Sequence, residues 1–308
     1  MCQIQFALQA ILTQKIKLST NNISLHIRRE DLIHPFVSGN KFRKLKYNLL
    51  QAKLENQDAL LTFGGAFSNH IAAVAFAGKE HGFKTIGIIR GDELGDKISE
   101  NPTLQFAQNC GMQFEFISRE AYRMKSETAF LENLEQKFGN FYAIPEGGTN
   151  ELAVKGCQEI LSEADTEFDY ICCSVGTGGT ISGIINSSLE HQKILGFPAL
   201  KGDFLQNEIR NFAQNDNWDL ITDYHFGGYA KVNPELIAFM NWFYKENQIP
   251  LDPIYTGKMV FGVMDLMHKN YFPEKSKILL LHTGGIQGIA GMNNKLKSKQ
   301  LPTIDFHV

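Results

Sequence analysis

Short apolar runs alternate along this chain with longer stretches in which apolar residues recur at helical spacing. Five runs are short, apolar and bounded by glycine or polar residues, as buried strands are: 59–63, 85–89, 114–117, 170–174 and 278–281. A helical pattern covers stretches between them, at 42–56, 69–81, 102–110 and 151–164. Continuous apolar strands without polar alternation suit parallel sheets that are covered on both faces. The chain is therefore predicted to be an α/β protein with open, twisted, mostly parallel sheets.

Bulk properties narrow the class of partner and the compartment. A length of 308 residues is more than one compact core usually holds, so two domains are expected. The net charge of -3 argues against a nucleic-acid partner, which selects a basic surface. There is no apolar run of about 18 residues, so no membrane span is expected, and no secretory signal is recognised at the N-terminus. No CxxC pair or metal-ligand cluster occurs, so no metal site is expected. We expect a cytoplasmic protein whose cysteines are buried, reduced thiols: Cys2, Cys110, Cys157, Cys172 and Cys173.

Three junctions between a predicted strand and the following segment are rich in glycine and small polar residues, at 62–70, 174–183 and 281–286. Ligands of open α/β sheets bind beyond the carboxyl ends of the strands, where all three would lie. The second junction has backbone N–H groups and a following helix that can together bind a phosphate, over Gly176, Thr177, Gly178, Gly179 and Thr180. It is neither a Walker loop nor a dinucleotide fingerprint. A tight turn needed only for helix–sheet packing is the alternative interpretation.

Two lysines stand three residues apart where the first predicted helix begins, and they share one face of it: Lys41 and Lys44. A solvated helix start is the simpler interpretation. However, cations at a helix N-terminus oppose the macrodipole, which indicates a nearby anion or a lysine with a depressed pKa. A desolvated lysine beside another cation is a competent nucleophile toward a carbonyl. A ligand with both an aldehyde and a phosphate would suit the two lysines and the glycine-rich loop together.

The remaining candidates are polar or aromatic residues near the other junctions. Ser68 fits a helix N-cap, and free N–H groups at that turn can also bind a substrate carboxylate. His70 taken alone is a histidine satisfied in the core or at the surface. Tyr229 and Tyr255 either pack as ordinary aromatics or act as acid or base, the latter if a neighbouring cation lowers the pKa of the phenol.

Taken in order, these pieces resemble the pyridoxal-phosphate enzymes of the tryptophan-synthase β-subunit type (fold type II), and more closely the D-cysteine desulfhydrase / 1-aminocyclopropane-1-carboxylate deaminase family. The resemblance rests on four motifs: Gly39-Asn40-Lys41-x-Arg43-Lys44-Leu45, Gly64-Gly65-x-x-Ser68-Asn69-His70, Ile144-Pro145-Glu146-Gly147-Gly148-Thr149-Asn150 and Asp252-Pro253-Ile254-Tyr255-Thr256-Gly257-Lys258. It implies pyridoxal 5'-phosphate as cofactor, a small amino-acid substrate and a homodimer. It also implies two α/β domains with the cofactor between them, a large one of residues 1–44 and 146–308 and a smaller one of residues 45–145.

The resemblance implies a role for each candidate residue. Lys41 is the lysine joined to the cofactor aldehyde, and Lys44 holds the phosphate together with residues 176–180. Asn69 is implied to contact the pyridine hydroxyl, Thr283 the pyridine nitrogen and Thr256 another part of the cofactor. The residues implied to contact the substrate are Ser68, Asn69, His70, Tyr229 and Tyr255. The phosphate loop itself looks more like that of cysteine and threonine synthases.

The activity implied is α,β-elimination on a small amino acid, with the cofactor as electron sink. Thr256 stands where ring-opening deaminases have glutamate, and His70 where they have glutamine, so D-cysteine is the expected substrate, giving pyruvate, ammonia and sulfide. Either the Lys41 amine or Tyr255 removes the Cα proton. Three alternatives stay open: ring opening of 1-aminocyclopropane-1-carboxylate to 2-oxobutanoate, β-replacement of the cysteine-synthase kind, and a non-catalytic protein that binds the cofactor or a partner.

Overall fold

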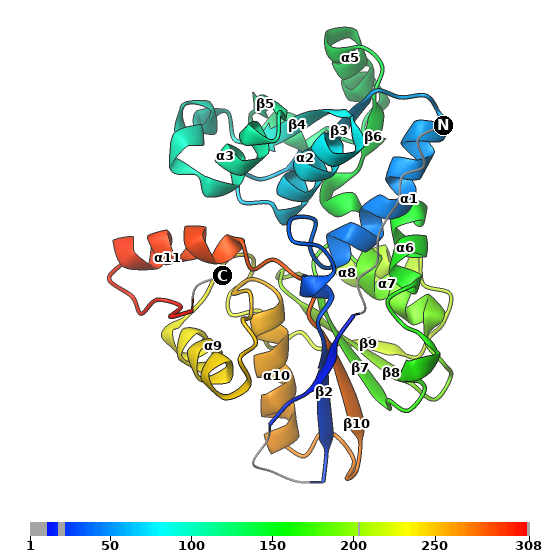
Figure 1. Ribbon diagram of the computed structural model, residues 1–308, viewed down its shortest axis with the longest axis vertical. Coiled ribbons are helices and arrows are strands. Elements are labelled where there is room, and N and C mark those ends of the chain that lie inside the picture. The colour runs from blue at the N-terminus through cyan, green and yellow to red at the C-terminus, as the bar shows by residue number, and fades with distance from the viewer. Residues whose placement is uncertain (1–10, 18–21, 203, 307–308) are drawn as a thin grey trace.

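The computed structural model describes residues 11–17, 22–202 and 204–306. They form two sheets, one in the upper half and one in the lower half of the view in Figure 1. The larger sheet has the strand order β1-β2-β10-β7-β8-β9, with β1 Thr13–Lys15, β2 Ser24–Arg28, β10 Lys277–Leu281, β7 Tyr170–Val175, β8 Lys193–Pro198 and β9 Trp218–Leu220. The smaller sheet has the order β5-β4-β3-β6, with β5 Gln113–Ile117, β4 Lys84–Arg90, β3 Ala59–Gly64 and β6 Tyr142–Ile144. Neighbouring strands are parallel except β1 and β2, so the predicted α/β fold with two open, mostly parallel sheets is confirmed.

Helices cover both faces of the larger sheet. Successive residues of a strand point to opposite faces, so Ile278 and Leu280 of β10 join one hydrophobic cluster while Leu279 and Leu281 join the other. The first cluster includes residues of α9 (Pro234–Asn247), α10 (Thr256–His268) and α11 (Gly288–Ser298). The second includes residues of α6 (Glu151–Gln158), α7 (Gly179–Ser187) and α8 (Phe204–Arg210). Such two-sided burial explains why these strands are apolar throughout.

The smaller sheet is enclosed in the same way. One face packs against α1 (Asn40–Leu54), α2 (Asn69–His81) and α3 (Pro102–Asn109), and the other carries residues of α4 (Arg119–Arg123) and α5 (Thr128–Phe138). Every buried apolar residue of α1 belongs to this smaller core, at Phe42, Leu45, Leu49 and Ala52. The predicted domain limit between residues 44 and 45 falls inside α1, and the two-domain division stays a prediction.

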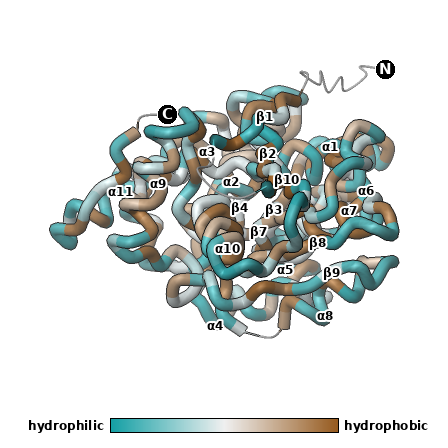
Figure 2. Tube along the Cα trace, turned by 90° about the horizontal axis from the view of Figure 1, so that it is seen from below, coloured by the Kyte–Doolittle hydropathy of each residue, from teal (hydrophilic) through white to brown (hydrophobic). Residues whose placement is uncertain are grey.

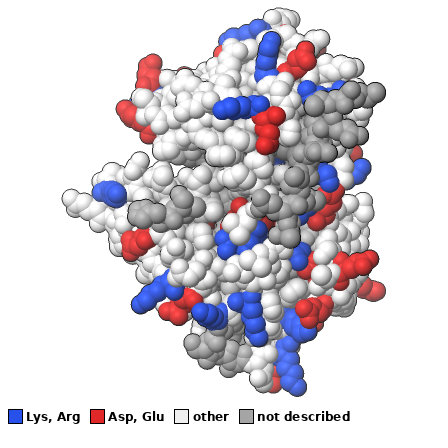
Figure 3. Space-filling view, viewed as in Figure 1, with Lys and Arg blue, Asp and Glu red and all other residues white. Residues whose placement is uncertain are grey.

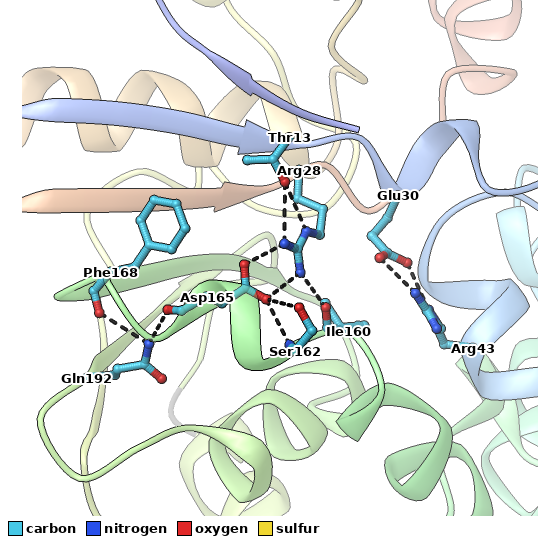
Figure 4. Close-up of polar contacts among 9 residues, drawn as sticks. All are labelled: Thr13, Arg28, Glu30, Arg43, Ile160, Ser162, Asp165, Phe168 and Gln192. Carbon is cyan, nitrogen blue, oxygen red and sulfur yellow. Dashed lines mark hydrogen bonds and ion pairs between the residues drawn. The ribbon is translucent and has the colours of Figure 1, made fainter. Parts of the chain in front are cut away.

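Secondary structure follows the predicted pattern closely at the strands and at α2, whose bounds are those expected. The predicted helix over 151–164 is wrong in its second half, because α6 ends at Gln158. There the chain turns to meet Arg28, whose guanidinium donates to Ile160 O at 2.6 Å and to Asp165 Oδ2 at 2.8 Å (Figure 4). Asp165 also accepts from the backbone N–H of Ser162, which closes a capping box around a short 3-10 turn. A buried arginine from β2 therefore ends the helix.

The exterior is polar and mixed in charge. Figure 2 shows a mostly hydrophilic periphery around hydrophobic strands, and on the face in Figure 3 acidic and basic side chains are interspersed. Among the described residues no helix is long and apolar enough to cross a membrane, and no group of three His, Cys, Asp or Glu is placed to hold a metal. The thiols of Cys110, Cys157, Cys172 and Cys173 are free, and Cys2 lies outside the described residues.

Candidate active site

A cleft lies where the carboxyl ends of β3, β7 and β10 meet the N-terminal ends of α1, α2 and α7. The cleft is open to solvent, and its empty space, including that open part, is about 660 Å³. Of the predicted site residues, those that line it are Lys41, Lys44, Asn69, Gly176, Thr177, Gly178, Thr180, Tyr255 and Thr283. The structure thus brings together residues that are far apart in the chain and come from both sheets.

The loop between β7 and α7 forms one wall of the cleft. Gly178 has φ +83, a conformation that favours glycine, and it caps the N-terminus of α7. A Cβ on Gly176 would lie 3.2 Å from the Tyr255 ring, so only glycine leaves this approach open. Gly179 does not line the cleft and begins α7, packed against Thr149. The wall therefore presents backbone and small hydroxyls at a helix N-terminus, an arrangement that favours an anion.

Lys44 places a buried positive charge beside this loop. Its side chain is enclosed, with the residue 2% exposed, and Nζ donates to Gly147 O at 3.0 Å and to Thr149 Oγ1 at 2.9 Å. Thr177 Oγ1 lies 3.4 Å from the same nitrogen. Within the described part of the chain no carboxylate pairs with this ammonium, and burial lowers its pKa. A buried cation that only neutral oxygens satisfy is electrostatically incomplete, and a bound phosphate would complete it.

Lys41 lies one turn before Lys44 and also faces the cleft. Burial, and then the charge of Lys44, lower its pKa from 10.5 to about 7. A large fraction of this amine is therefore neutral near pH 7, the form that attacks a carbonyl or accepts a proton. The predicted depressed lysine pKa is thus found at the site, with desolvation as its main cause.

The N-terminal turn of α1 is held in place from three sides. Arg43 and Glu30 form a buried bidentate ion pair, with Nε to Oε2 at 3.0 Å and Nη2 to Oε1 at 3.1 Å (Figure 4). Asn40 Nδ2 donates to Thr180 Oγ1 at 2.8 Å, which ties α1 to α7. Gly39 has φ +61, and a Cβ there would lie 2.0 Å from Thr283 O. The closeness of these contacts fixes the direction in which Lys41 and its neighbours point.

The turn before α2 supplies the wall from the smaller sheet. Ser68 Oγ accepts from His70 N at 3.2 Å and from Ile71 N at 3.4 Å, so Ser68 is the N-cap that the sequence predicts. Asn69 lines the cleft, and its Oδ1 accepts from Gln287 Nε2 at 3.2 Å. His70 is turned inward instead, 2% exposed, with Nε2 at 2.8 Å from Thr62 Oγ1. Neither Ser68 nor His70 is part of the cleft wall, so their predicted substrate contacts stay predictions.

Two tyrosines stand at the open side. Tyr255 lines the cleft, whereas Tyr229, 39% exposed, does not line it but meets the Tyr255 ring edge to face, with centroids 6.2 Å apart. Burial raises the pKa of both phenols, and for Tyr255 the neighbouring Tyr229 and Asp252 raise it further. Arg90 acts to lower the pKa of Tyr229, but burial outweighs it and the net shift is upward. Both phenols are therefore protonated near pH 7 and act as hydrogen-bond donors.

The floor beneath Tyr255 contains hydroxyls and a buried carboxylate. Thr283 Oγ1 lies 3.2 Å from Ser174 Oγ. Thr256 begins α10 fully buried, and its Oγ1 has no hydrogen-bond partner among the described residues. Asp252 accepts from the backbone N–H of Tyr255 at 2.6 Å, and burial raises its pKa to about 7. Asp252 was noted only as part of a motif. Gln287 at the mouth was not predicted, since a lone glutamine after a glycine turn carries no local signal.

The comparison with protein families identifies the cofactor of this chain. A family model described as pyridoxal-phosphate dependent enzyme matches residues 11–284. The chain belongs to this family. Pyridoxal phosphate is therefore its cofactor, and the cleft fits that group on two observations made above: the incomplete positive charge of Lys44 beside the glycine-rich loop, and the largely neutral amine of Lys41.

Similar proteins point to one branch of the family. A putative 1-aminocyclopropane-1-carboxylate deaminase of Pyrococcus horikoshii is 31% identical over 297 residues, covering 89% of this chain and 88% of that protein. The bifunctional mitochondrial D-cysteine desulfhydrase/1-aminocyclopropane-1-carboxylate deaminase of Arabidopsis thaliana is 30% identical, covering 87% and 74%. A crystal structure of an ACC deaminase homologue matches with a TM-score of 0.82 and 27% identity over 96% of this chain and 95% of that one. The resemblance predicted from the motifs is confirmed.

Proposed function

We propose that this enzyme catalyses α,β-elimination on a small amino acid, with D-cysteine as the substrate. The Cα–H and Cβ–S bonds break, sulfur leaves as sulfide, and the remaining aminoacrylate takes up water to give pyruvate and ammonia. When bound, the cofactor draws electrons away from Cα of the amino acid. The observation that carries the proposal is the amine of Lys41, with its pKa near 7, next to the incomplete charge of Lys44 in one cleft.

Each wall of the cleft has its own task in this proposal. Lys41 is the lysine joined to the cofactor, and Lys44 with residues 176–180 would hold the phosphate, the part of that ligand with the largest negative charge. Asn69, Thr283 and Thr256 are assigned to the pyridine ring. The unpartnered Oγ1 of Thr256 supports this, because a buried hydroxyl without a partner is costly unless a ligand satisfies it.

The substrate carboxylate is assigned to the start of α2. Ser68 Oγ already accepts two backbone N–H groups, so its own O–H is left to donate. The positive end of this 13-residue helix favours an anion at the same place. His70 lies behind the turn, where its bond to Thr62 orients the residues that contact the substrate.

Proton transfer is assigned to Lys41 and not to Tyr255. Both phenols have raised pKa values, whereas the pKa of Lys41 is lowered to about 7. The general base nearest in pKa to the working pH is the effective one. Lys41, released when the amino group of the substrate takes its place on the cofactor, therefore accepts the Cα proton. Tyr255 and Tyr229 keep their protons and donate hydrogen bonds at the open side of the cleft.

The direct test is to record the visible spectrum of the purified protein and then follow pyruvate after adding D-cysteine. We expect a band at roughly 410–430 nm, from a lysine-bound cofactor, and pyruvate without any added nucleophile. Lys41→Ala should remove both the band and the turnover. Lys46→Ala is the matched control, because Lys46 lies on the same helix but pairs with Glu159 outside the cleft. Turnover retained by Lys41→Ala would refute the assignment.

Ring opening of 1-aminocyclopropane-1-carboxylate is the second candidate, favoured by the names of the two relatives above. It is tested by measuring 2-oxobutanoate with that substrate in the same assay. Product formed only on addition of a nucleophile would instead indicate β-replacement. A cofactor band without any product would indicate a binding protein.

We also propose that the enzyme works as a homodimer in the cytoplasm. The family resemblance supports the dimer, and the free, largely buried thiols support a reducing compartment. Light scattering on the purified protein measures the mass, and fractionation of cells of the source organism tests the compartment.

A further inference from the structure

The loop of residues 221–233, which carries Tyr229, has an unusual backbone. It joins β9 to α9 without regular structure. Around Tyr229 the backbone has φ +53 at Phe226, +90 at Gly227, +111 at Gly228 and +53 at Ala230. Glycine tolerates such values, but phenylalanine and alanine rarely adopt them. A backbone of this kind persists only when surrounding contacts impose it.

A buried lysine from α10 makes the contacts that impose it. Lys258 Nζ donates to His225 O at 2.9 Å and to Gly228 O at 2.9 Å. Those two carbonyls also close consecutive turns, because Gly228 N donates to His225 O at 3.0 Å and Lys231 N to Gly228 O at 3.2 Å. One ammonium therefore joins two consecutive turns, the second of which contains Tyr229.

This ammonium is costly to bury and does little else. Lys258 is 2% exposed, and no carboxylate among the described residues forms an ion pair with it, Asp252 acting on it only at longer range. Burial lowers its pKa to about 8. A methionine of similar volume would fill the same space without the desolvation penalty. Stability alone therefore gives no reason for a lysine at this position.

Lys258 also stands in a fixed relation to the active site. It follows Tyr255, the N-cap residue of α10, by three residues, and the carbonyl it binds on Gly228 directly precedes Tyr229. One end of α10 thus carries Tyr255, and its Lys258 clamps the loop that carries Tyr229. The two tyrosine rings meet edge to face, with centroids 6.2 Å apart.

We propose that Lys258 is a positioning residue, which clamps the carbonyls of His225 and Gly228 and thereby holds the Tyr229 ring against Tyr255 at the mouth of the cleft. This inference rests on the proposed function where it concerns turnover. The clamp itself does not depend on which substrate the enzyme uses.

The test compares Lys258→Met with Lys295→Met in the full-length, cofactor-loaded protein. Lys295 is the matched control, because its Nζ donates to Ala230 O at 3.2 Å in the same loop but from an exposed position. Amide hydrogen exchange of peptides covering 221–233 is the first measurement. We expect exchange about tenfold faster or more in Lys258→Met and unchanged in Lys295→Met, since only the former releases both turns. Unchanged exchange in Lys258→Met would overturn the proposal.

A double-mutant cycle with Tyr229→Phe is the second measurement. Each single change should lower kcat by about 10–100-fold, and Tyr229→Phe added to Lys258→Met should lower it by less than about twofold more, because the hydroxyl is already misplaced. Fully additive losses would overturn the proposal. If Lys258→Met is too unstable to purify, Lys258→Leu, which also removes the donor, carries the same test. If the wild-type enzyme releases no product from any substrate offered, the proposed function fails, while the exchange measurement still decides on the clamp.

Discussion

The two sides of the cleft are built differently. On the phosphate side, residues follow strands directly: the loop after β7 is short, Lys44 is buried, and neighbouring backbone leaves no space for a side chain at Gly39. On the rim, Tyr229 sits on a long loop without regular structure, 39% exposed, and its position depends on a lysine from another helix. In the proposed function, binding of a constant cofactor would therefore use rigid elements, and contact with the substrate would use a loop that can vary without disturbing them.

The largest effect is expected from breaking the phosphate side. In Lys44→Met the dissociation constant of the cofactor should rise about 100-fold, because the phosphate loses its buried, positively charged partner. The apoprotein should be as stable as wild type or more so, since an unpaired buried ammonium is replaced by an apolar chain. Absorbance titration and thermal unfolding measure the two quantities. Lys46→Met, the control on the same helix, should change binding by no more than about twofold. Equal binding by wild type and Lys44→Met would contradict the comparison.

Gly39→Ala tests the rigidity of the same side. The added Cβ would lie 2.0 Å from Thr283 O at a φ of +61, so backbone must move. We expect the free energy of unfolding to fall by about 3 kcal/mol and cofactor binding to weaken. Gly82→Ala is the control, with φ +72 and no atom within 4 Å of the new Cβ, and should cost only about 1 kcal/mol. Similar losses of unfolding free energy in both variants, measured by urea unfolding, would show that the close approach of Gly39 to Thr283 O does not matter for stability.

The lowered pKa of Lys41 predicts a pH dependence for cofactor attachment to the apoprotein. Only the neutral amine attacks the aldehyde, so the rate should rise with pH through about 7 and level off above it. Because Lys44 contributes to the lowering, Lys44→Met should move the midpoint to higher pH. Stopped-flow absorbance between pH 5.5 and 9 (roughly the range in which this amine titrates) measures both profiles. A midpoint near 10 in wild type would mean that Lys41 is not desolvated.

The smallest effect is expected at the mouth of the cleft. Gln287→Ala removes the donor to Asn69 Oδ1, a bond of 3.2 Å at an exposed position. We expect KM to rise by about threefold with kcat nearly unchanged, because one exposed hydrogen bond contributes little. Steady-state kinetics separate the two constants. A loss in kcat of more than about tenfold would place Gln287 in the chemistry itself.

The contrast between the two sides also explains what the sequence could predict. The strands were predictable because burial on both faces makes them continuously apolar, and Lys41 and Lys44 because two cations at a helix start are unfavourable without an anion. Residues 183–219 allowed no prediction, since β9 has three residues and α8 has seven, and the apolar run of β8 is interrupted by Gly196 although the strand is continuous. Lys258 and Gln287 act through partners 30 and 218 positions away, and no local pattern reports such contacts.

Mapping the modified lysine is the most direct way to learn whether Lys41 is the lysine joined to the cofactor. Borohydride reduction of the cofactor-loaded protein makes the bond between the lysine and the cofactor permanent, and peptide mass spectrometry then locates it. We expect the added mass on Lys41, with fragmentation of the peptide distinguishing Lys41 from Lys44. Modification of Lys44, Lys258 or any other lysine, with Lys41 unmodified, would contradict this expectation.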